Sequence, residues 1–184
     1  CLSWGFNQVA VKLAIHDIPP MIQSSLRSAA AALIVAAWCK ARGIPLLARD
    51  GTLVPGLAAG ALFGIEFMCI YQGLVYTTAT RAVLFIYLAP FFVVLGARIF
   101  LPADRFGAAQ WLGLALSFAG MIVAFGLPTP ALDPRQAIGD LMMVGGAVFW
   151  AATTLIIKAS ALSRISSEKV MLYQLVVSAP VLAL

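Results

Sequence analysis

Residues 53–75, LVPGLAAGALFGIEFMCIYQGLV, form one continuous apolar run that contains a single charged side chain, Glu66. A helix of about 20 mostly apolar residues is long enough to cross the hydrocarbon core of a bilayer. The run lacks the strict alternation of polar and apolar residues that a membrane β-barrel strand shows. Because a segment in lipid must satisfy its own backbone hydrogen bonds, we predict a membrane-spanning helix here.

Apolar runs of the same kind recur along the whole chain, separated by short polar gaps. They occupy residues 2–15, 21–39, 53–75, 79–101, 108–125, 139–159 and 170–184. We therefore predict an all-α polytopic membrane protein with seven helices. Pro90 lies inside a run and removes one backbone hydrogen bond, which predicts a kink that either acts as a gate or shapes the bundle. Because the first and last runs are short, we expect a fragment of a longer protein.

The composition of the chain agrees with a membrane protein. Of the 184 residues, 62% are apolar and 10% are charged, and the mean hydropathy is +1.00. Soluble domains are about 45–50% apolar and about 25% charged. The net charge of +5 comes mostly from basic residues in the gaps, so we expect a lipid bilayer rather than a nucleic acid as partner. Cys1, Cys39, Cys69 and His16 lack metal-ligand spacing, so we expect neither a metal site nor a cofactor.

The distribution of basic residues between alternate gaps predicts the orientation in the membrane. One set of gaps holds eight of them: Lys40, Arg42, Arg49, Arg98, Arg105, Lys158, Arg164 and Lys169. The opposite set holds only Arg81 and Arg135. Cytoplasmic loops carry the excess of Lys and Arg, so we assign the first set to the cytoplasm. Arg81 is then expected at the outer membrane interface.

Two segments that begin 146 residues apart share a pattern. Residues 4–12 are WGFNQVAVK and residues 150–158 are WAATTLIIK. Both place polar residues three and four positions after Trp, and Lys eight positions after it. The copies lie in the first and the sixth predicted helices, an offset of five, so the second copy would insert upside down, which is a transporter architecture. An interfacial Trp with a snorkelling Lys is the alternative explanation.

Several motifs resemble the EamA domains of the drug/metabolite transporter superfamily. They are WGFN at 4–7 with Lys12, the Pro19-Pro20 turn with Arg27, the stretch 61–126, and Gly139-Asp140 leading into Trp150. Within that stretch, LPADR at 101–105 followed by Gln110, Gly113 and Gly120 resembles the Glu-Arg, Gln, Gly and Gly signature that closes each five-helix unit. Asp104 stands where the signature usually has Glu.

The resemblance implies ten helices in two inverted EamA repeats. This chain would hold a complete repeat in residues 1–127, a periplasmic linker in residues 128–139, and the first two helices of a second repeat in residues 140–184. It also implies a multi-pass protein of the bacterial inner membrane that exports or exchanges a small molecule, such as an amino acid or a drug. Protons are the candidate coupling ion, and a homodimer is a candidate assembly.

Two other function classes compete with the secondary transporter. A structural or assembly membrane protein without transport activity is the alternative. An enzyme is not expected, because the sole histidine, His16, lies in a predicted turn and no catalytic motif accompanies it.

Glu66 is the residue that points most directly to a function. It lies near the middle of its predicted helix, where an ionised carboxyl facing lipid would cost at least a few kcal/mol. Gly56, Gly60 and Gly64 form two consecutive GxxxG steps, which predict a helix-packing seam, and Glu66 lies about 100° from that stripe. We expect Glu66 to face a cavity or a partner, with Arg27 and Tyr87 as candidate partners at similar depth. A structural contact without a transport role is the alternative.

The remaining candidates for substrate or coupling roles are polar or aromatic side chains inside predicted helices. They are Asn7, Gln8, Lys12, Arg27, Trp150, Thr153 and Thr154. The repeats of an inverted-repeat transporter meet near the midplane, which would place the repeat-related polar positions along a path. Snorkelling of the two basic residues and interhelical hydrogen bonds of the others are the alternative interpretations.

Overall fold

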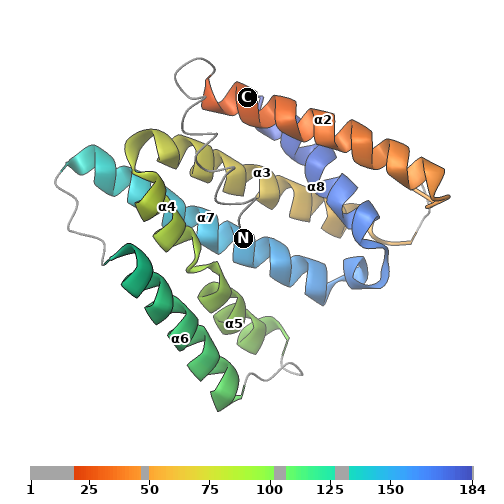
Figure 1. Cartoon of the computed structure of the whole chain (residues 1–184). Coiled ribbons are helices and arrows are strands. Elements are labelled where there is room, and N and C mark those ends of the chain that lie inside the picture. The colour runs from red at the N-terminus through yellow and green to blue at the C-terminus, as the bar shows by residue number, and fades with distance from the viewer. Residues whose placement is uncertain (1–18, 47–49, 102–106, 127–132, 184) are drawn as a thin grey trace.

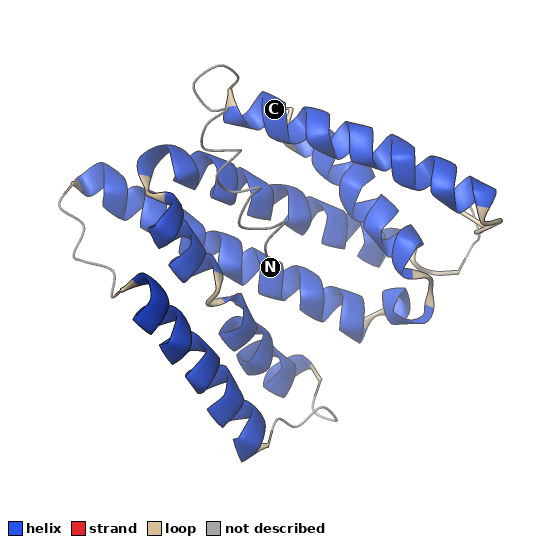
Figure 2. Cartoon of the chain, in the orientation of Figure 1, coloured by secondary structure: helices blue, strands red, loops and turns tan. Residues whose placement is uncertain are grey.

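The computed structural model describes residues 19–46, 50–101, 107–126 and 133–183, and these ranges contain helices and connecting turns with no strand (Figures 1 and 2). The helices are α2 (Pro20–Ala41), α3 (Leu53–Tyr76), α4 (Ala79–Ile86), α5 (Ala89–Phe100), α6 (Ala108–Phe125), α7 (Pro134–Ala159) and α8 (Ser167–Val181), with the 3-10 helix η1 (Ala161–Arg164) before α8. The predicted all-α fold is confirmed. The predicted helix at 2–15 lies outside the described residues.

Four described segments are long and apolar enough to cross a membrane. They are Met21–Ala41, Leu53–Tyr76, Ala79–Phe100 and Pro134–Ala159. Most helix ends lie within about three residues of the predicted ones, but α7 begins at Pro134 rather than at residue 139. Proline is favoured in the first turn of a helix, and the Asp133 carboxylate accepts a hydrogen bond from the Arg135 N–H at 3.0 Å as an N-cap. Residues 134–139, which we predicted as linker, are therefore helical.

Helix α3 lies at the centre of the bundle, and α7 crosses it at very close range (Figure 1). A Cβ atom on Gly73 would come 3.1 Å from the carbonyl oxygen of Gly139. A Cβ atom on Gly139 would come 2.9 Å from the backbone nitrogen of Thr77. Because these neighbours are backbone atoms, only glycine lets the two helices approach this closely.

The glycine stripe of α3 lies against α8. A Cβ atom on Gly56 would come 2.7 Å from the Tyr173 ring, and one on Gly60 would come 2.6 Å from Val177. A Cβ atom on Gly64 would come 2.9 Å from Val181. Both partners advance four residues at a time, so the two helices run alongside each other over three successive turns. The sequence predicted the seam, and the structure identifies α8 as the helix that occupies it.

The helix predicted at 79–101 is divided in two. Helix α4 ends at Ile86 and α5 begins at Ala89, and Tyr87 and Leu88 form a turn between them. Pro90 has no N–H, and its ring would clash with the carbonyl group of Ile86 in a continuous helix, so the interruption falls just before it. The interruption lies where Pro90 predicts a kink, and the two pieces together make one apolar segment of membrane length.

The main core lies between α3, α4 and α7. Its buried side chains are Phe67, Ile70, Tyr71, Leu74, Ala82, Ile86, Ala89, Met143, Ala147 and Leu182. Helix α6 lies at the side of the bundle next to α4 and α5 (Figure 1), where its Phe118 meets Phe91 edge-to-face with ring centroids 5.3 Å apart. Gln110, part of the EamA-like signature, accepts a hydrogen bond from the Gly107 N–H at 2.6 Å and so caps the start of α6.

Candidate functional site

Glu66 lies on the side of α3 that packs against α7. Its residue is only 4% exposed. Ile70 and Gly73, four and seven residues further along, share this side and both lie close to α7. A Cβ atom on Gly146 of α7 would lie 3.2 Å from the Ile70 side chain and 3.6 Å from the Glu66 carbonyl oxygen. The partner of the Glu66 face is therefore α7.

The Glu66 carboxyl forms no hydrogen bond or ion pair with another residue in the described ranges. Its two predicted partners lie elsewhere. Arg27 is placed over two aromatic rings, and Tyr87 is 40% exposed at the turn after α4. The predicted contact of Glu66 with Arg27 or Tyr87 is therefore absent from this structure. Nothing described beside Glu66 offsets the loss of hydration that its ionised form would suffer in a membrane interior.

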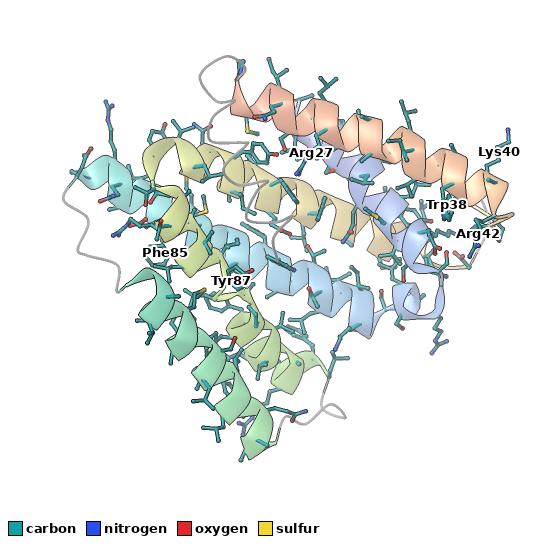
Figure 3. The ribbon with its side chains drawn as sticks, viewed as in Figure 1. Arg27, Trp38, Lys40, Arg42, Phe85 and Tyr87 are labelled. Carbon is teal, nitrogen blue, oxygen red and sulfur yellow. The ribbon has the colours of Figure 1, made fainter. Side chains whose placement is uncertain are left out.

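Arg27 joins α2 to α3 through a stack of aromatic side chains. Figure 3 shows its side chain between these two helices. Its guanidinium carbon lies 4.7 Å from the ring centroid of Phe67 and 5.5 Å from that of Tyr71. The two rings are consecutive in a stripe along α3, with centroids 6.1 Å apart. This is the geometry of a cation–π interaction, and Arg27 has no acidic partner in the described ranges.

Three buried polar groups near Arg27 have no hydrogen-bond partner among the described residues. We name Gln23, Ser24, Arg27 and Tyr71 the Arg27 cluster. The groups are Oε1 of Gln23, Oγ of Ser24 and the hydroxyl of Tyr71. Ser24 and Tyr71 are 0% and 2% exposed. The Tyr71 hydroxyl lies next to the Ser24 hydroxyl and within electrostatic reach of the Arg27 charge. Because buried polar groups in proteins are normally hydrogen-bonded, a cluster with several unpaired groups indicates a function.

Arg81 is buried in an ion pair with Asp140. Its Nε donates to both carboxylate oxygens, at 3.1 and 3.2 Å, and its Nη2 pairs with Oδ2. Thr77 adds a hydrogen bond to Oδ1 at 2.7 Å. Arg81 and Asp140 are 9% and 8% exposed, so Arg81 pairs inside the bundle, while its depth at the membrane interface stays a prediction. These three residues, which we name the Asp140 cluster, join the end of α3 and the start of α4 to α7.

Asp140 was not among the site residues predicted from the sequence. Its position inside the apolar run at 139–159 could have identified it, because an ionisable side chain there needs a partner. The partner is 59 residues away in the sequence, in a helix that packs on α7 only in the folded protein.

A second ion pair lies at the other end of α3. Lys169 of α8 donates to Asp50 at 2.7 Å, and Thr52 donates to the same carboxylate through its hydroxyl and its N–H. The Thr52 hydroxyl also lies 3.2 Å from that of Tyr173. The Lys169 hydrogen bond, followed by the Thr52 hydroxyl, lowers the pKa of Asp50 from 3.8 to about 2. We name these four residues the Asp50 cluster.

The remaining sequence candidates fall in different surroundings. Thr153 is 2% exposed, and its hydroxyl has no hydrogen-bond partner in the part of the chain that the structure describes. Thr154 donates to the carbonyl oxygen of Trp150, one turn earlier in its own helix, at 3.0 Å. Trp150 is 38% exposed. Asn7, Gln8 and Lys12 lie outside the described residues, and no three potential metal ligands converge within the described ones.

The described residues form an all-helical bundle with four helical segments of membrane length and with buried charged side chains. A family model, the EamA-like transporter family, matches residues 1–126, and the chain belongs to this family. The resemblance found in the sequence motifs is confirmed. A crystal structure with 24% sequence identity superposes with a TM-score of 0.69 and covers 97% of this chain and 63% of the other, which shows the same fold.

Several curated relatives are named as transporters. The chain is 25% identical over 150 residues to "Uncharacterized transporter YoaV" of Bacillus subtilis (strain 168), covering 81% of this chain and 51% of the relative. It is 24% identical over 156 residues to "Uncharacterized inner membrane transporter YedA" of Escherichia coli (strain K12), covering 82% and 48%. It is 34% identical over 101 residues to the "Riboflavin transporter" of Rhizobium johnstonii, covering 53% and 30%. The chain thus spans about half the length, or less, of these relatives.

Proposed function

We propose that the full-length protein is a secondary transporter that exports or exchanges a small metabolite across a bacterial inner membrane, driven by protons. Membership of a transporter family and the names of the relatives support the transport activity. The name of the Escherichia coli relative supports the membrane. Because the family and these relatives are transporters, we infer that the protein is not an enzyme.

The buried carboxyl of Glu66 carries the proposal of proton coupling. Glu66 lies 13 residues after the start of α3 and 10 residues before its end. At 1.5 Å per residue these separations are roughly 20 and 15 Å, which places the carboxyl near the middle of the span. A structural carboxyl at such a depth needs compensating partners, as Asp140 has, and Glu66 has none in the described ranges.

A carboxyl in this position is suited to carry a proton. The neutral carboxyl can remain buried against α7. The ionised carboxyl needs water, a cation or a substrate beside it. Protonation of Glu66 is therefore coupled to a change of its surroundings. Substrate and proton can then compete for the same group, which is the basis of exchange across a membrane.

The test begins with the full-length protein in cells. Metabolites released by cells that express it are compared with those released by cells that carry an empty vector, and the exported compound is then studied with the purified protein in vesicles. We expect Glu66→Gln to fold and bind but to lose the dependence of transport on a pH gradient, and Glu66→Asp to keep part of it. Gln72→Leu, a loss of polarity in the same helix at a half-exposed position, is the matched control and should leave coupling unchanged.

Two outcomes would contradict the proposal. Gradient-driven transport that Glu66→Gln leaves unaltered would remove Glu66 from the mechanism, and uniport or exchange without protons would remain. If no metabolite is released above the empty-vector level, export fails, and the structural or assembly protein becomes the better account.

A further inference from the structure

The Arg27 guanidinium lies within a membrane span without a counter-charge in the described ranges. Arg27 is seven residues after the start of α2, or about 10 Å along the helix. The residue is half-buried and its charged group is held over Phe67 and Tyr71 rather than extended to the end of the helix. A charge inside a span is costly and is normally paired or used by a ligand. The aromatic rings offset only part of this cost.

Among the described residues nothing is hydrogen-bonded to the N–H groups of Arg27, so these groups can donate to an anion. Stacking occupies one face of the planar guanidinium, whereas its N–H groups point outward in the plane and match the two oxygens of a carboxylate. The hydroxyls of Ser24 and Tyr71 lie beside each other near the same charge, and each can turn to donate to an anion. The unpaired Oε1 of Gln23 is an acceptor that can take an ammonium or hydroxyl group. The cluster therefore combines several donors with one acceptor.

The charge of the cluster favours a carboxylate over a phosphate. The cluster contains one positive charge and no acidic side chain. A carboxylate with one negative charge would neutralise it, whereas a doubly charged phosphate would leave an unpaired negative charge in a region of low dielectric constant. Neutral ligands would leave the guanidinium uncompensated.

From this arrangement we propose that the Arg27 cluster binds the carboxylate of the transported molecule, which makes the substrate a small organic acid or an amino acid. The inference rests on the proposed transport function, because it names the substrate class of the same protein. The Arg27 guanidinium binds the carboxylate, the Ser24 and Tyr71 hydroxyls donate hydrogen bonds to it, and Oε1 of Gln23 accepts one from a neighbouring donor group of the ligand. Glu66 faces α7 instead, so the two charged residues have separate tasks in this conformation.

The experiment measures thermal stabilisation of the purified full-length protein by matched pairs of probes. The pairs are acetate and acetamide, benzoate and benzamide, and phenylalanine and phenylalaninamide, with inorganic phosphate as a further anion. We expect at least one carboxylate to raise the melting temperature in a saturable way, and its amide to have no such effect. Arg27→Gln should abolish the effect and Arg27→Lys should keep part of it.

Two further variants make the test specific. Tyr71→Phe removes a single donor to an anion and should weaken binding of the carboxylate about tenfold or more, which keeps the test valid if Arg27→Gln does not fold. Arg42→Gln is the matched control, because Arg42 directly follows the end of the same helix and stacks over Trp38 at 5.6 Å but is exposed. We expect Arg42→Gln to leave binding unchanged.

The proposal is overturned if no carboxylate stabilises the protein more than its amide, if phosphate is preferred to every carboxylate, or if Tyr71→Phe binds normally. It is also overturned if Arg42→Gln weakens binding as much as Arg27→Gln does. Binding in detergent does not require transport. If the protein binds carboxylates normally but exports nothing, only the proposed transport function is contradicted. If it exports a metabolite but binds no carboxylate, only the proposal that the Arg27 cluster binds a carboxylate is contradicted.

Discussion

The two ends of α3 are held by the same set of groups in different surroundings. Each end has an aspartate, a basic side chain and a threonine that donates to the aspartate. In the Asp140 cluster both charged side chains are 11% exposed. In the Asp50 cluster the lysine is 4% exposed but the aspartate is 30% exposed. The comparison teaches that the same set of groups can be a buried constraint at one end of a helix and a partly hydrated contact at the other.

The difference follows from the cost of removing charges from water. A buried ion pair gains little overall, because desolvation offsets most of the attraction, yet the loss of one partner leaves a charge that nothing compensates. Breaking an ion pair that is partly exposed to water costs less stability, because water solvates the charge that remains and salt already screens the attraction.

The strongest test of this comparison breaks the Asp140 cluster. Asp140→Asn removes the carboxylate charge that pairs with the buried guanidinium of Arg81 and should destabilise the full-length protein by about 3–5 kcal/mol. Denaturant unfolding in mixed micelles measures the change. The double variant Arg81→Met with Asp140→Leu should be less destabilised than Asp140→Asn, since both charges are gone. A loss below about 1 kcal/mol for Asp140→Asn would show that this pair behaves like a surface contact.

A smaller effect is expected from the glycines near the two ends. The Cβ atom that Gly139→Ala adds would lie 2.9 Å from the Thr77 nitrogen and 3.0 Å from the Gly73 carbonyl oxygen, which are backbone atoms that cannot move independently. The one that Gly56→Ala adds meets only the Tyr173 ring, at 2.7 Å, and the ring can turn aside. We expect the free energy of unfolding to fall by about 2–3 kcal/mol in Gly139→Ala and by about 1 kcal/mol in Gly56→Ala, measured in the same unfolding assay. Equal losses would show that the two ends are equally rigid.

The smallest effect concerns pH at the Asp50 cluster. The pKa of Asp50 is lowered from 3.8 to about 2 by Lys169 and Thr52, so its charged form contributes stability above about pH 4, and this contribution is lost as the pH falls towards 2. Asp50→Asn should lower the melting temperature modestly at pH 6, and the difference from the unsubstituted protein should disappear near pH 2. High salt should also reduce it at pH 6. A difference independent of pH would mean that the charge of Asp50 is not what stabilises this end.

The local features of the sequence predicted the helices well. The length of an apolar run and the prolines and polar gaps beside it act within a few residues, so α3 and α6 begin where expected. The break between α4 and α5 also falls where Pro90 predicts a kink. The exception is α7, which Asp133 and Pro134 start in a polar segment that hydropathy alone assigns to a linker.

The sequence by itself determined that the protein is a helical membrane protein, that α3 carries a glycine seam, and that Glu66 lies deep in a span, because each depends on spacing along one helix. Only the tertiary structure decided which side chains meet. It joined Arg81 to Asp140, placed Arg27 over Phe67 and Tyr71 rather than beside Glu66, and turned the Glu66 face towards α7. Helical spacing fixes which residues share a face, whereas the rotation and the neighbours of each helix are set by packing between segments far apart in the sequence.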